Sequence, residues 1–197
     1  MRLVTTVCFL IIVAGAMYLV WQPTDMVWVY SSITGKDYEV KRAPDQQRMA
    51  DRLAMLEQTL HTFLDRANAA MPSEPRIQTI RSRWDGTLSE TEASEDVAFS
   101  IDKTSISLCL RDSLGRVEEY NASVFVLIHE LAHIATSDYG HSPEFWENMK
   151  FLLEVAEKNG LYTYTDYSAQ ATTYCGHPLG SSPLTCVKQR TCSSLLT

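Results

Sequence analysis

The segment that most constrains the fold of this chain is VFVLIHELAHIA, residues 124–135, an apolar run interrupted by three polar side chains. In a helix, His129 and His133 lie one turn apart on the same face, and Glu130 borders that face because it is rotated from His129 by about 100°. Burying these groups in a core-facing helix is unfavourable unless a metal ion or polar partners satisfy them. The segment therefore predicts a buried helix that carries a functional site.

The spacing of the two histidines predicts a zinc site, because a tetrahedral zinc ion can take two imidazoles from consecutive turns of a helix. Glu130 is then placed to act as the general base toward water. A catalytic zinc takes three protein ligands, and we predict His141 as the third, since Gly140 lets the chain turn back before the next helix. The competing donors are Asp138, Glu144, Glu147 and His177.

The flanking segments predict a compact α+β domain with a small antiparallel sheet. Apolar residues at spacings of three and four predict a helix over residues 49–71, whereas residues 77–84 suit a short helix or strand, followed by an acidic loop. Alternating residues at 97–101 and 106–110 predict two antiparallel strands, the second forming an edge able to pair with a peptide. Asn121 is the expected N-cap of the HELAH helix.

A further helix is predicted to begin after Ser142, with Pro143 at its first position, and to end near Asn159 and Gly160. Beyond it, Tyr164, Tyr167 and Tyr174 are candidates to stabilise an oxyanion, although packing is the favoured role for each.

The amino-terminal residues predict a membrane anchor, because residues 3–21 carry no charge and are long enough as a helix to cross about 30 Å of hydrocarbon. We expect an anchor at 1–22, a connector at 23–43, the domain at 44–185 and a flexible tail at 186–197. A signal peptide cleaved near Ala16 is the alternative. Lysine and arginine flank the run on both sides, so the side of the membrane stays open.

Charge and cysteine content narrow the partners. The formal net charge of -7 disfavours a broad basic face, so a nucleic-acid partner is not expected. Outside the apolar run, Cys109, Cys175, Cys186 and Cys192 could form disulfides or remain buried thiols. Cys175 could also be a fourth metal ligand, but a buried thiol is the favoured interpretation.

The motif HELAH, followed by GHSPEF, resembles the zinc sites of WLM and SprT-like metallopeptidases. Residues 95–185 also look like the small, membrane-anchored WLM-like proteins of large DNA viruses and algae. The resemblance implies a zincin-like domain with ligands His129, His133 and His141 and with Glu130 as the base. No Met-turn pattern follows the motif, which disfavours a metzincin.

These observations predict a membrane-anchored zinc metallopeptidase that hydrolyses a protein or peptide substrate. The alternative is a catalytically silent membrane module that uses zinc for folding or partner binding, which a fourth protein ligand would favour. Proteolysis of DNA-crosslinked proteins, an activity of the relatives, is disfavoured by the acidic charge and the expected anchor.

Overall fold

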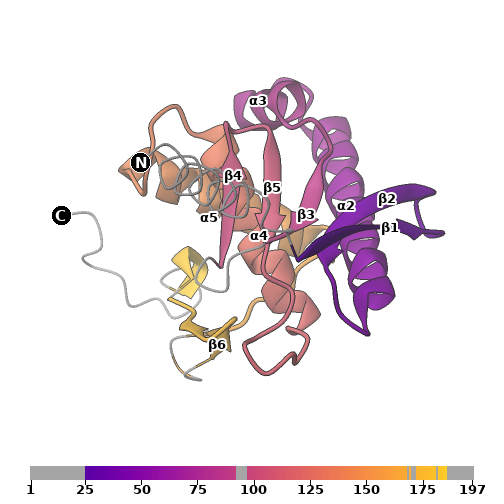
Figure 1. The fold of residues 1–197 in the computed structure, drawn as a ribbon. Helices are drawn as coiled ribbons and strands as arrows, with labels where there is room; N and C mark the ends of the chain where they lie inside the picture. The colour runs from indigo at the N-terminus through magenta and orange to yellow at the C-terminus, as the bar shows by residue number, and fades with distance from the viewer. Residues whose placement is uncertain (1–24, 92–96, 168, 170–171, 181, 186–197) are drawn as a thin grey trace, which may run out of the picture.

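A computed structural model describes residues 25–91, 97–167, 169, 172–180 and 182–185 of the chain. The elements run in the order β1 (Met26–Ser31), β2 (Lys36–Lys41), α2 (Gln46–Ala70), α3 (Pro75–Arg83), β3 (Leu88–Glu90), β4 (Ala98–Ile101), β5 (Ser105–Leu108), α4 (Tyr120–Ala135), α5 (Pro143–Lys158), β6 (Thr173–Tyr174) and β7 (His177–Pro178) (Figure 1).

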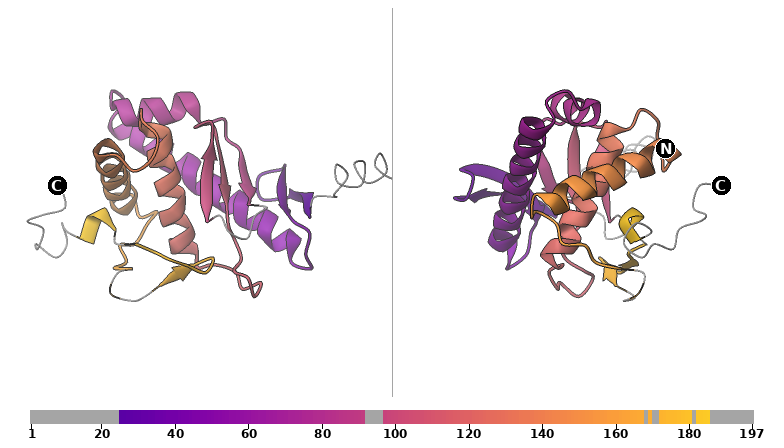
Figure 2. Two further views of the ribbon diagram at one scale, coloured as in Figure 1. Left: turned by 60° about the vertical axis from the view of Figure 1, so that its left-hand side comes forward. Right: turned by 180° about the vertical axis from the view of Figure 1, so that it is seen from behind.

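The main sheet has three strands in the order β3-β5-β4, with β3 parallel and β4 antiparallel to β5. Helices α2 and α4 pack against one face of this sheet, and α5 packs on α4 at its outer side (Figure 2). The apolar residues of both layers form one core, which includes Leu53, Ile106 and Leu131. This α+β arrangement with small sheets places the HELAH helix between the sheet and α5.

The predicted antiparallel pair at 97–101 and 106–110 is confirmed by β4 and β5, but the expected edge is wrong. The central strand is β5, because β3 pairs with its other side through the register Leu88↔Ile106. The sequence around β3 looked like the start of an acidic loop, so its parallel pairing was missed. The strand at the edge beside the HELAH helix is therefore β4.

The apolar stripe predicted over residues 49–71 is confirmed by α2, whose spaced residues from Met49 to Ala67 are buried. The region 23–43, predicted as a connector, differs: β1 and β2 form an antiparallel hairpin that packs against α2. Val40 is fully buried, and the Tyr38 hydroxyl donates to Glu57 Oε2 at 2.6 Å. The structured domain thus begins before residue 44.

The membrane-anchored fold and the single-pass membrane localisation predicted from the sequence require correction. Within the described ranges, no helix is both long and apolar enough to cross a bilayer. Helix α2 has 25 residues, but its outer face carries charges such as the exposed Arg48. Helix α4 is apolar, but its 16 residues extend only about 24 Å at about 1.5 Å each. Residues 1–22, on which the prediction rested, lie outside the described residues.

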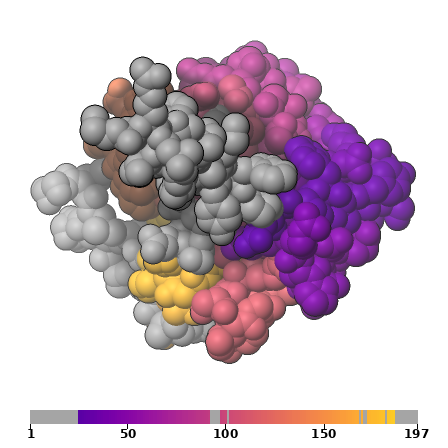
Figure 3. Space-filling view, in the orientation of Figure 1, coloured from indigo at the N-terminus to yellow at the C-terminus, as the bar shows by residue number. Residues whose placement is uncertain are grey.

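The segment after α5 returns along the domain and is fastened to the end of β5. A disulfide joins Cys109 to Cys175, so the buried thiol expected at Cys175 is wrong. The fully buried Tyr174 donates its hydroxyl to the Cys109 carbonyl at 2.7 Å, and the Cys175 amide donates to Glu118 at 2.7 Å. Figure 3 shows this segment in yellow beside the chain that precedes α4.

Candidate metal centre

Two side chains fix the start of helix α4, one by bonding to the helix itself and the other by bonding to the segment after α5. Glu119, rather than the expected Asn121, caps the helix, accepting a hydrogen bond from the Ala122 amide at 2.8 Å. Asn121 instead donates to the Thr163 carbonyl and accepts from the Thr163 amide, both at 2.8 Å. The N-cap prediction failed because this partner lies 42 residues away, while the helix position itself was correct.

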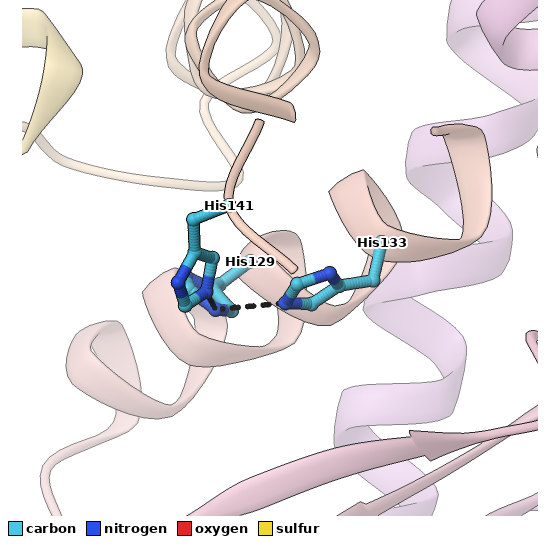
Figure 4. A group of neighbouring side chains, drawn as sticks. All are labelled: His129, His133 and His141. Atoms are coloured by element: carbon cyan, nitrogen blue, oxygen red, sulfur yellow. Dashed lines mark hydrogen bonds between the residues drawn. The ribbon is translucent and has the colours of Figure 1, made fainter. Parts of the chain in front are cut away.

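Three histidines converge at the carboxyl-terminal half of α4 (Figure 4). His129 and His133 extend from the helix, and His141 reaches them from the segment before α5. The Nε2 atom of His129 lies 3.2 Å from that of His133 and 3.1 Å from that of His141. Each pair of rings has centroids 5.0 Å apart. This group could hold a metal ion.

Direct hydrogen bonding cannot satisfy all three rings equally well. Both short contacts meet at His129 Nε2, which offers one hydrogen or one lone pair in a neutral ring. Burial, together with its histidine neighbours, lowers the pKa of His129 to about 3, and burial and His141 lower that of His133 to about 4. Neutral rings with convergent lone pairs are the state in which histidine binds a metal.

Glu130 lies beside the histidines and is almost completely buried, with 4% of its surface exposed. Burial raises the pKa of Glu130 to about 7, and a hydrogen bond from the Ser100 backbone of β4 partly opposes that rise. No salt bridge to Glu130 occurs in the part of the chain that the structure describes. The carboxyl is thus poised to exchange a proton near neutral pH.

The loop that delivers His141 is held by Lys103, which lies between β4 and β5. Its ammonium donates to the carbonyls of Thr136, Ser137 and Asp138 at 2.7, 2.8 and 3.0 Å. Lys103 has a left-handed backbone conformation, with a φ of 59°, and its side chain reaches the residue that follows α4. Such left-handed turns between strands carry little sequence signal outside glycine, so the role was not apparent.

Helix α5 packs against the three histidines through Phe145. Phe145 is fully buried, and its ring centroid lies 4.8, 4.4 and 4.7 Å from those of His129, His133 and His141. Ser142 caps α5 by accepting a hydrogen bond from the Phe145 amide, and Pro143 is in the first turn, as predicted. The cap therefore fixes the ring against which the histidines stack.

The other candidate metal donors are not part of the histidine group. The Glu144 carboxylate accepts a hydrogen bond from the Ser137 amide at 3.3 Å, and the Asp138 carboxylate is outside the histidine group. Neither Glu147 nor His177 joins the histidine group, which is the group among the described residues that could hold a metal ion. Cys175 is committed to the disulfide and is removed as a fourth ligand.

The three tyrosines considered for oxyanion stabilisation have other contacts. Tyr174 bonds to the Cys109 carbonyl, Tyr164 donates to Thr185 at 3.2 Å, and Tyr167 packs on Phe125 with ring centroids 5.0 Å apart. These contacts support the packing role that the sequence favoured.

A pocket of about 260 Å³ opens beside His129 and Glu130. The remaining lining residues are mostly apolar and come from four segments: Val97, Ala98, Phe125, Val126, Trp146, Met149, Leu179 and Gly180. The sequence did not indicate this pocket, because its walls are assembled from residues up to 83 positions apart, from Val97 to Gly180.

The chain is similar to three viral proteins. It is 26% identical over 184 residues to an uncharacterised protein of Acanthamoeba polyphaga mimivirus, a match that covers 88% of this chain and 93% of the relative. Uncharacterised proteins of Invertebrate iridescent virus 6 and Invertebrate iridescent virus 3 are 37% and 36% identical over 71 and 66 residues, covering 34% and 33% of this chain. Those two matches span 40% and 42% of the relatives' own lengths. No protein-family model and no solved structure matches the chain.

Proposed function

We propose that this chain is a zinc-dependent metallopeptidase in which His129, His133 and His141 hold zinc and Glu130 is the general base. The observation that carries the proposal is the convergence of three histidine side chains beside a buried carboxyl. Two nitrogen ligands about 2.0–2.1 Å from a tetrahedral zinc ion lie about 3.3 Å apart. The Nε2 separations of 3.2 and 3.1 Å are close to that value.

The donor set suits zinc better than a hard cation, because imidazole nitrogens favour zinc and related transition metals over calcium or magnesium. A zinc ion with three histidine ligands and an open fourth position polarises a carbonyl and makes water a nucleophile near neutral pH. The chain itself supplies the proton transfer. Glu130 accepts the proton of the attacking water and can return it to the leaving amine.

A peptide is the substrate class that the surroundings favour. Strand β4 is the outer strand of its sheet and lies against α4, with Val97 and Ala98 beside the pocket. The Ser100 backbone of β4 is bonded to Glu130, and the remaining backbone groups of an outer strand can pair with an extended peptide. A substrate paired in this way would run along β4 and pass the histidines and Glu130.

The alternative is a catalytically silent zinc module. Structural zinc sites usually have four protein ligands, whereas catalytic sites have three. In the described ranges the group contains three donors, which favours the enzyme.

The test is metal analysis of the purified full chain, combined with hydrolysis of a mixed peptide library. We expect about one zinc ion per chain and cleavage that a strong chelator abolishes. The His177→Ala variant is the matched control and should keep both properties, because His177 is exposed and outside the group. A chain that binds zinc yet leaves every peptide of the library intact would support the silent module instead.

A further inference from the structure

The pocket beside Glu130 is built to hold an apolar group. Phe125 and Val126 of α4 and Met149 of α5 are 5%, 6% and 1% exposed, and Leu179 lines the pocket from the carboxyl-terminal segment. An apolar cavity of only about 150 Å³ is known to hold a benzene molecule. The volume of about 260 Å³ is therefore enough for an aromatic or large aliphatic side chain.

We propose that this pocket binds a bulky apolar side chain of the substrate next to the bond that is cut, with Leu179 as a specificity-determining residue. The proposal rests on the proposed function, because the pocket shares His129 and Glu130 with the candidate metal centre. Binding there removes an apolar side chain from water close to the reacting carbonyl.

The Leu179 wall is kept in place by contacts that lie a few residues before it. Strands β6 and β7 pair through Thr173↔Pro178 and Tyr174↔His177, and the Leu179 amide donates to the Thr172 carbonyl at 2.9 Å. Within that turn, Cys175 is bonded to Cys109 at the end of β5. The disulfide therefore connects Leu179 to the sheet. Selectivity for the substrate side chain depends on this disulfide, whereas the position of the three histidines does not.

The test measures binding, so that it does not require turnover. Two simple hydroxamates, one with a benzyl and one with a methyl substituent beside the zinc-binding group, are titrated into the zinc-loaded full chain by calorimetry. We expect the benzyl compound to bind about 10- to 100-fold more tightly, the range for burying one large apolar side chain. Equal affinities of the two compounds would overturn the pocket proposal.

Two variants locate the selectivity. Leu179→Ala should reduce the benzyl preference about 3- to 10-fold and leave the methyl compound unchanged, whereas the exposed Leu114→Ala control should change neither. The double variant Cys109→Ser with Cys175→Ser should also lower the preference while keeping one zinc ion per chain. If Leu179→Ala weakens both compounds equally, or keeps the full preference, Leu179 does not determine specificity. If neither hydroxamate binds the zinc-loaded protein, the open metal position is excluded, and the proposed function with it.

Discussion

Two buried carboxylates of this domain have opposite surroundings. Glu90 at the end of β3 has a side chain that is 1% exposed, and Arg111 donates to both of its oxygens at 2.9 and 2.7 Å. Glu130 is similarly buried, but its described neighbours are histidines, apolar side chains and one backbone amide. A buried carboxylate paired with a cation, such as Glu90, helps to hold the fold together. A buried carboxylate without a cation, such as Glu130, lowers the stability of the domain.

The comparison extends to the three clustered histidines, which also have no carboxylate partner among the residues described. The exposed His61, outside this cluster, is the histidine that pairs with a carboxylate, that of Glu57. The Arg111 cluster is completed by groups of the chain itself, because Arg111 also donates to Asp45 and to the Lys41 carbonyl. The histidine cluster instead has ligand atoms that could hold a metal ion, and in the described ranges it contains no other donor. Removing a member of each cluster should thus affect different properties.

Glu130→Gln should produce the largest effect on activity, a loss of about 10²- to 10⁴-fold in peptide hydrolysis, because the amide cannot accept the proton of water. Zinc content should be unchanged, and stability should be equal or higher, since a buried ionisable group is removed. Initial rates, zinc per chain and urea unfolding of the same samples check these points. A fully active Gln variant would exclude Glu130 as the base.

Arg111→Met should have the opposite profile, with stability lowered by about 3–5 kcal/mol, because Glu90 is left buried without its partner. The matched control is Arg116→Met. Arg116 pairs with Asp112 at the surface, with 76% of its side chain exposed, so its loss should change stability by about 1 kcal/mol or less. Urea unfolding at pH 7 compares the two, and equal losses would show that the Glu90 pair contributes no more than a surface pair.

His141→Ala should weaken zinc binding at least 100-fold, because His141 is a proposed ligand, and should leave metal-free stability nearly unchanged, because its side chain is exposed. His177→Ala and Glu147→Ala should keep their zinc after dialysis against a weak chelator. If Glu147→Ala loses zinc and His141→Ala retains it, the third ligand is a carboxylate of α5.

Lys103→Met should weaken zinc binding about 10- to 100-fold, as expected for a group that orients a ligand without touching the metal. The change removes three hydrogen bonds to the loop that carries His141. Lys158→Met, at the exposed end of α5, is the control. The visible spectrum of the cobalt-substituted protein separates this role from general destabilisation, because only a shifted histidine alters the ligand field.

The smallest expected effect is in proton release. Ordinary histidines with a pKa near 6.5 are mostly protonated at pH 6, so three of them would release about two protons on binding zinc. Burial lowers the pKa of His129 to about 3 and that of His133 to about 4. Both are therefore already neutral at pH 6, and their affinity for zinc falls only when the pH drops toward those values. Calorimetry at pH 6 in buffers of different ionisation enthalpy, done on the Glu130→Gln variant so that the proton of Glu130, whose pKa is raised to about 7, is not counted, should show about one proton or fewer; two or more would contradict the burial of these rings.

Local sequence determined the parts of the candidate centre that one or two adjacent elements build. His129 and His133 are placed by the period of a single helix, and the Ser142 cap with Pro143 fixes the start of the next helix. The position of His141 follows because only seven residues separate it from His133. Spacing and capping depend on backbone geometry alone, so they could be predicted without knowledge of the fold.

Tertiary structure alone decided the features that need residues far apart in the chain. The parallel pairing of β3 makes β4 the outer strand, Lys103 holds a loop 33 to 35 residues away, and the Cys109–Cys175 disulfide spans 66 residues. The hairpin in the expected connector likewise became visible only through the burial of Tyr38 and Val40 against α2. The sequence by itself determined His129, Glu130 and His133, because one helix orders them. Their burial, the altered pKa values and the apolar pocket depend on packing between segments, which local patterns do not encode.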